Sequence, residues 1–85
     1  MTDQEFDILD ELYFVISFHE LSDRLSIEET LLKNELLSLI QKGWVKILKP
    51  FSDEEVETWE HYENLYKEYF YLATKKGLMV HNLKS

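Results

Sequence analysis

The chain has no cysteine, one proline and two glycines among its 85 residues. Without cysteine it can form neither a disulfide framework nor a thiolate metal site. Its glycines, Gly43 and Gly77, are too far apart for a glycine-rich phosphate-binding loop. The acidic N-terminus has no basic region followed by an apolar run, and no apolar stretch reaches the roughly 18 residues of a membrane span. We therefore expect a cytoplasmic protein with no signal peptide and no membrane contact.

Basic residues are also scarce. Nine Lys and Arg residues stand against 17 Asp and Glu residues, and the net charge is -8. Residues 53–69 hold seven acids and one lysine, so most of the excess lies in one segment. Such a segment repels nucleic acid and favours basic partners, or simply keeps the protein soluble. An apolar content of 45% is enough for a packed core, and the length predicts a single domain over residues 1–85.

The N-terminal apolar residues recur at helical spacing. They predict a first helix over residues 3–16. Ser17, followed three residues later by Glu20, has the spacing of a capping box and predicts a second helix over residues 18–25. The apolar positions of the first helix are Phe6, Leu9, Leu12 or Tyr13, and Ile16.

A tight turn and a longer helix follow. Ser26 occupies the turn, at a position that often needs a left-handed backbone. The next helix covers residues 28–42 and ends at Gly43, which suits a left-handed cap. Its buried stripe is formed by Leu32, Leu36, Leu39 and Ile40.

The C-terminal half contains two short apolar runs. Residues 44–48 and 69–73 read as strands that pair with each other. Thr74 can cap a final short helix over residues 75–83. Gly77 lies inside that helix, where it costs roughly 1 kcal/mol relative to alanine.

The segment between the two strands, residues 52–68, fits two patterns. Ser52 and Glu55 have capping-box spacing, and a helix would place Val56, Trp59, Tyr62 and Tyr66 on one side. The alternative is a long irregular wing with a hairpin bend near Asn64. We expect a helical turn or two inside a wing.

The apolar pattern resembles the winged helix-turn-helix domains of bacterial transcription regulators. The resemblance is carried by Leu21, Leu25, Ile27, Leu32, Leu36, Leu39, Lys42-Gly43 and Val45, and by the tail from Tyr71 to Leu78, which includes Thr74-Lys75-Lys76-Gly77. It implies an α+β fold with a three-helix core, a two-stranded wing and a short C-terminal helix. The wing of this chain departs from the family pattern by a long acidic insertion. In that family the second helix of the motif lies in the major groove of DNA.

By position, six residues of that helix would face DNA: Glu28, Glu29, Thr30, Lys33, Asn34 and Ser38. The last four could donate hydrogen bonds to phosphates or bases. The two glutamates and the acidic wing oppose binding to phosphates. Two functions therefore stay open. One is a small non-enzymatic module that acts through protein contacts or self-association, and the other is a DNA-binding regulator.

The wing aromatics also have two interpretations. They either cover the wing sheet and the first helix as core, or form a partner surface, with Trp59, Tyr62 and Tyr66 as candidate contacts. His61 and Glu57 could form half a metal site on a helix, but a surface ion pair is the simpler interpretation. We expect no cofactor and no catalytic site, because no arrangement of nucleophile, base or metal ligands is evident.

Overall fold

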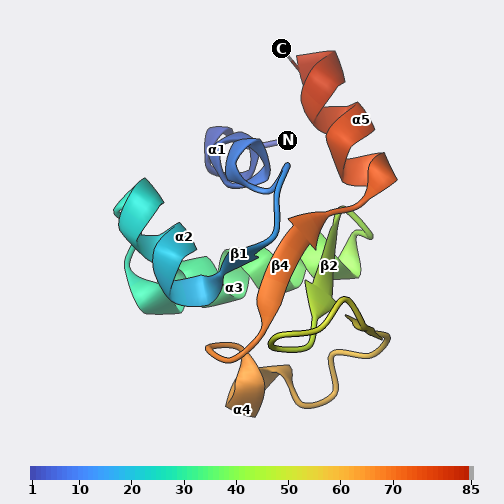
Figure 1. Cartoon of the computed structure of the whole chain (residues 1–85). Coiled ribbons are helices and arrows are strands. Elements are labelled where there is room, and N and C mark those ends of the chain that lie inside the picture. Colours follow the sequence, from blue (N-terminus) through green and yellow to red (C-terminus); the bar gives the residue numbers. More distant parts are fainter. Residues whose placement is uncertain (85) are drawn as a thin grey trace.

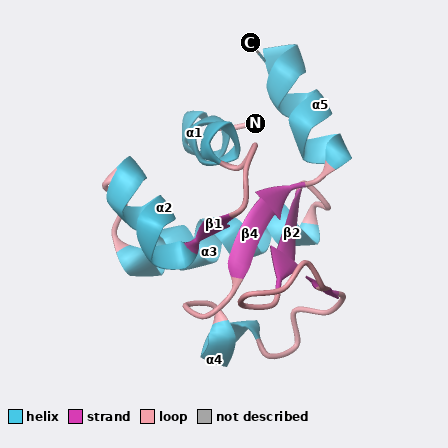
Figure 2. Ribbon diagram, in the orientation of Figure 1, coloured by secondary structure: helices cyan, strands magenta, loops and turns pink. Residues whose placement is uncertain are grey.

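The computed structural model describes residues 1–84, which form five helices and one four-stranded sheet (Figure 1). Helix α3 crosses one face of the sheet, while α1 and α5 lie near one end of it (Figure 2). No helix in residues 1–84 is long and apolar enough to cross a membrane. In chain order the elements are α1 (Asp3–Glu11), β1 (Ile16–Ser17), α2 (Phe18–Leu25), α3 (Glu29–Gln41), β2 (Val45–Leu48), β3 (Glu55–Val56), α4 (Tyr62–Leu65), β4 (Phe70–Ala73) and α5 (Lys75–Lys84).

The sheet is antiparallel, with strand order β1-β4-β2-β3. Its centre is the predicted pair, in which Val45 lies opposite Ala73 and Leu48 opposite Phe70. Alternate residues of β4 point into the core, and Tyr71 is fully buried. The outer strands β1 and β3 are two residues long each.

The first helix is shorter than predicted. It ends at Glu11 instead of residue 16, and Ile16 lies in strand β1, where it pairs with Tyr71 of β4. The Leu12 carbonyl accepts a hydrogen bond from the backbone N–H of Ala73 at 2.9 Å. The chain therefore leaves the helix to run along β4, where Ile16 is still buried, so its helical spacing was also compatible with a strand.

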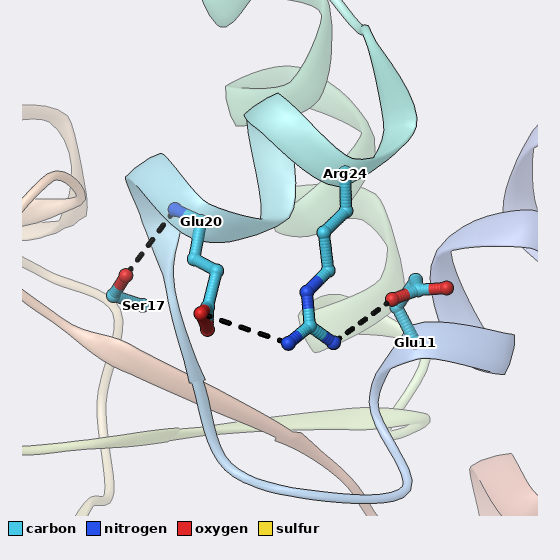
Figure 3. A network of polar contacts seen from close by, with 4 residues as sticks. All are labelled: Glu11, Ser17, Glu20 and Arg24. Carbon is cyan, nitrogen blue, oxygen red and sulfur yellow. Dashed lines mark hydrogen bonds and ion pairs between the residues drawn. The ribbon is translucent and has the colours of Figure 1, made fainter.

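The helix-turn-helix follows the sequence prediction closely. Ser17 Oγ accepts a hydrogen bond from the backbone N–H of Glu20 and caps α2. Ser26 is left-handed, with a φ of 53°, and Gly43 ends the α3 region with a φ of 80°. Arg24 of α2 bridges Glu11 of α1 at 3.3 Å and Glu20 at 3.6 Å, tying the first two helices together (Figure 3).

The insertion between β2 and β4 contains both strand and helix. The Ser52 hydroxyl accepts a hydrogen bond from the backbone N–H of Glu54, so it caps a turn, and a helix starting at Ser52 is wrong. The chain then adds β3 to the sheet edge and forms the single turn α4, which confirms the expected helical turn inside the wing. The bend near Asn64 is this helix and not a hairpin. Tyr62 of α4 is 1% exposed and joins the main core.

Candidate functional site

The outward face of α3 is uncharged. Its exposed residues are Thr30, Leu31, Asn34 and Gln41, and none of them is ionisable. Leu31 is 42% exposed, which places an apolar side chain at the surface of the helix that would face DNA. The charged residues of the helix are half-buried on its flanks.

Glu28 occupies the N-terminus of α3. Its carboxylate accepts hydrogen bonds from the backbone N–H groups of Thr30 and Leu31, each at 3.1 Å. These bonds, the one from Thr30 first, hold the pKa of the Glu28 carboxyl below its ordinary value. Free N–H groups at a helix N-terminus are where a phosphate binds. Here the protein's own carboxylate already uses two of them.

One flank of α3 is covered by α4. The Tyr62 hydroxyl donates a hydrogen bond to the Lys33 backbone carbonyl at 2.9 Å. The Glu63 carboxylate lies 2.5 Å from Lys33 Nζ, and this contact raises the pKa of the lysine. The Lys33 side chain is only 19% exposed. The lysine predicted to contact DNA is therefore neutralised by the wing.

A second set of contacts joins the wing to the same flank of α3, one helical turn before Lys33. Lys67 Nζ lies 3.0 Å from the Glu29 carboxylate, which raises the pKa of Lys67. The Tyr66 hydroxyl donates to the same carboxylate at 3.3 Å. The Tyr66 ring packs edge-on against the Phe18 ring, with 5.0 Å between the ring centroids. Glu29 thus binds the wing as well.

The nine predicted contact residues separate into three groups. Thr30 and Asn34 are exposed on the outward face of α3, with Ser38 half-buried. Glu28, Glu29 and Lys33 are engaged in the cap and wing contacts described above. Of the wing aromatics, Tyr62 is buried and Tyr66 half-buried, as in the core interpretation, whereas Trp59 is 46% exposed.

Three basic side chains elsewhere, Arg24, Lys42 and Lys49, also form ion pairs. Lys49 contacts Glu54 at 3.2 Å, and Lys42 contacts the buried Glu5 at 2.5 Å. Burial raises the pKa of the Glu5 carboxyl, but bonds from Lys42 and Thr2 outweigh burial and leave that pKa below its ordinary value. Within residues 1–84, no group of three His, Asp or Glu side chains is placed to hold a metal ion.

Sequence reasoning did not identify Glu63 and Lys67 as partners of α3. Glu63 lies 30 residues after its partner Lys33, and Lys67 lies 38 residues after its partner Glu29. Both are inside a segment whose apolar residues follow no clear helical or strand period. The one available signal was the run of acids beside aromatic residues, which indicated an unusual surface without showing that part of it folds back.

No protein-family model matches the chain, and no curated protein sequence matches it. Two solved structures are similar to it. One is a mutant of MarR from E. coli complexed with operator DNA, with a TM-score of 0.74 and 22% identity; it covers 98% of this chain and 52% of that chain. The other is the Multiple Antibiotic Resistance Repressor, MarR, with a TM-score of 0.75 and 22% identity; the match covers 98% of this chain and 53% of that chain. The chain thus spans about half the length of the MarR chains it matches, and its α+β fold is the winged-helix fold of MarR.

Proposed function

We propose that this chain is a non-enzymatic regulatory winged-helix module that acts through protein contacts. The observation that carries the proposal is the pairing of the cations around α3. Lys33 is neutralised by Glu63, and the exposed residues of the helix bear no charge. A surface that binds nucleic acid needs unpaired lysines and arginines to neutralise phosphates.

The remaining charges strengthen this argument. Non-specific DNA affinity comes almost wholly from cation–phosphate contacts, and each phosphate neutralised contributes to the salt dependence of binding. In this chain a phosphate approaching α3 meets the Glu28 carboxylate at the helix N-terminus. The net charge of -8 adds a long-range repulsion that is strongest at low salt.

The same face suits a protein partner. Interface cores are depleted in charged residues, and aromatic residues are enriched there. Leu31 and Thr30 on α3 present an uncharged surface, and a separate exposed aromatic residue, Trp59, lies in the wing. Exposed apolar side chains on a helix face are expected at such contacts.

A titration of a fluorescently labelled random duplex, followed by anisotropy, tests the proposal. We expect no rise in anisotropy at low ionic strength, even at protein concentrations of about 10⁻⁴ M, where non-specific binders give a signal at physiological salt. A salt-sensitive rise would refute the proposal.

DNA binding is the second candidate, and two observations favour it. MarR, whose fold this chain shares, has been crystallised with operator DNA, and Thr30 and Asn34 are exposed here on the second helix of the helix-turn-helix. If α3 contacts DNA, Glu63→Gln should tighten binding by releasing Lys33, and Lys33→Glu should abolish it. Asp7→Asn removes one negative charge from an exposed residue of α1 and is the matched control for Glu63→Gln. An equal gain from both variants would indicate a general charge effect.

A further inference from the structure

The face of the sheet that turns away from α3 is crossed by no helix of residues 1–84 (Figure 2). Phe70 and Leu72 of β4 point to this side, because they alternate with the core residues Tyr71 and Ala73. Leu48 of β2 lies opposite Phe70 and shares the side with it. We name this surface the open sheet face, and its residues are Val15, Leu48, Phe51, Phe70 and Leu72.

The strand sequences are those of a sheet covered on both sides. An antiparallel strand with one solvated face alternates apolar and polar residues. Strand β4 is instead apolar at all four positions, and Lys46 is the single polar residue of β2. A continuous apolar run of this kind is typical of a strand that is buried on both faces. The core covers one side of β4, but Phe70 and Leu72 on the other side are only half-buried.

A strained turn presents a phenylalanine beside this face. The Ser52 backbone N–H donates to the Lys49 carbonyl at 3.3 Å and closes a turn over Pro50 and Phe51. Phe51 has a φ of 55°, at a turn position where glycine or asparagine is favoured. Its side chain is 100% exposed, so no packing within residues 1–84 offsets the strain. Strained residues of this kind gather where a protein contacts a ligand or partner.

Phe51 also borders a hollow. The hollow has a volume of about 380 Å³ and is lined by Val15, Phe51, Ser52, Asp53 and Phe70. Val15 is 49% exposed, and the ring centroids of Phe51 and Phe70 lie 6.2 Å apart. Adjoining exposed apolar side chains mark a contact surface for another molecule. The hollow beside Phe51 can therefore receive apolar side chains of that molecule.

The charges around the open sheet face select the occupant. Asp53 lines the hollow, and Glu55 lies opposite Leu48 in the sheet. Neither carboxylate makes an ion pair with a side chain that the structure describes. Lys46 lies at the other end of the strand pair, opposite Leu72. A second copy of this chain would bring the same carboxylates and a net charge of -8, so charge favours a basic partner.

We propose that the open sheet face binds an amphipathic helix of a partner protein, with its apolar side over Phe51 and Phe70 and a lysine or arginine beside Asp53. A helix already covers the opposite face of the sheet, where α3 packs (Figure 2). This inference rests on the proposed function that the chain acts through protein contacts, and it adds a second surface to that of α3.

The test uses the whole chain, labelled with ¹⁵N, and an end-blocked peptide of about 14 residues with leucines at helical spacing and lysines between them. We expect amide shift changes to concentrate in residues 48–55 and 70–72. Phe51→Asn should weaken binding roughly tenfold, because it removes an exposed aromatic anchor. The same variant should raise the melting temperature by roughly 4 °C, because asparagine adopts a left-handed backbone at lower cost. A lower melting temperature with unchanged binding would overturn the inference, because Phe51 would then serve the fold alone.

Leu83→Asn is the matched control, because Leu83 is an apolar residue of α5 that is 86% exposed. It should leave peptide binding unchanged, and equal weakening by the control would overturn the inference. A peptide of the same composition in scrambled order has no apolar side and should bind at least tenfold more weakly. Equal binding of the scrambled peptide would show that charge attraction alone is responsible.

Two further outcomes concern the occupant. A peptide with glutamate in place of lysine should bind more weakly, and equal binding would overturn the basic character of the partner. Concentration-dependent shift changes at residues 48–55 and 70–72 without peptide would make a second copy the occupant and overturn the partner class. If neither the peptide nor duplex DNA gives a signal, only this inference fails. If duplex DNA binds, the proposed function fails irrespective of the peptide.

Discussion

Gly77→Ala should destabilise the protein, although helix propensity predicts the opposite. Gly77 lies inside α5, where alanine would be favoured by about 1 kcal/mol. A Cβ at this position would lie 2.1 Å from the Trp44 carbonyl oxygen, whereas ordinary van der Waals contact begins at 3.4 Å. The helix and the carbonyl would therefore have to separate by about 1.3 Å.

The separation has a further cost because the same carbonyl anchors α5. It accepts a hydrogen bond from the backbone N–H of Thr74 at 2.9 Å, and the Thr74 hydroxyl donates to the Gly43 carbonyl at 2.6 Å. Overpacking typically costs about 1–3 kcal/mol, and a weakened hydrogen bond adds about 1 kcal/mol. After subtraction of the propensity gain, the expected net loss in the free energy of unfolding is about 2 kcal/mol. For a domain of this size the melting temperature should fall by roughly 10 °C.

Urea denaturation followed by circular dichroism measures this loss. Lys76→Ala is the matched control, because Lys76 is the exposed neighbour in the same helix. The free energy of unfolding of this variant should lie within about 0.5 kcal/mol of that of the parent. A Gly77→Ala protein as stable as the parent would show that α5 does not need the close approach to Trp44.

Three further variants test other parts of the fold. Lys42→Met leaves the 3%-exposed Glu5 carboxylate without its cation and should cost about 3 kcal/mol at pH 7 in urea denaturation. The pKa of Glu5 is lowered in the folded state, so its ionised carboxylate adds to the free energy of unfolding above the unfolded pKa near 4.5. That contribution is lost as the pH falls through the folded pKa. Between pH 7 and pH 3 the variant should therefore lose less stability than the parent. Ser26→Gly should raise the melting temperature, with a gain of about 1 kcal/mol, because Ser26 has a φ of 53°. Tyr62→Phe removes the hydroxyl that donates to the Lys33 carbonyl and should cost about 1 kcal/mol in the same denaturation assay, and an unchanged stability would show that this hydrogen bond contributes nothing net.

The helix-turn-helix could be predicted because its signals are local. Ser17 and Glu20 form a cap within four residues, and the leucines of α3 recur at the period of one helix. Gly43 marks its end through a backbone angle that glycine adopts without strain. Strand β1 could not be predicted in this way, because Ile16 is in a strand only through its pairing with Tyr71, which lies 55 residues later.

The candidate site was only half predictable for the same reason. The positions on α3 follow from helix geometry, so the exposure of Thr30 and Asn34 could be anticipated. Whether Lys33 is free to meet a ligand depends on the path of the wing, which brings Glu63 against it. Residues 52–68 have no sustained period, so nothing in the sequence fixes that path.

The short outer strands of the sheet also affect how copies of this chain behave together. Long, flat strand edges recruit further chains and template fibrils. Here each outer strand is only two residues long, and β3 contains Glu55 and is flanked by Glu54 and Glu57. Repulsion between these carboxylates opposes edge-to-edge pairing of two molecules. The wing segment that carries most of the net negative charge therefore also opposes β-aggregation of the folded chain.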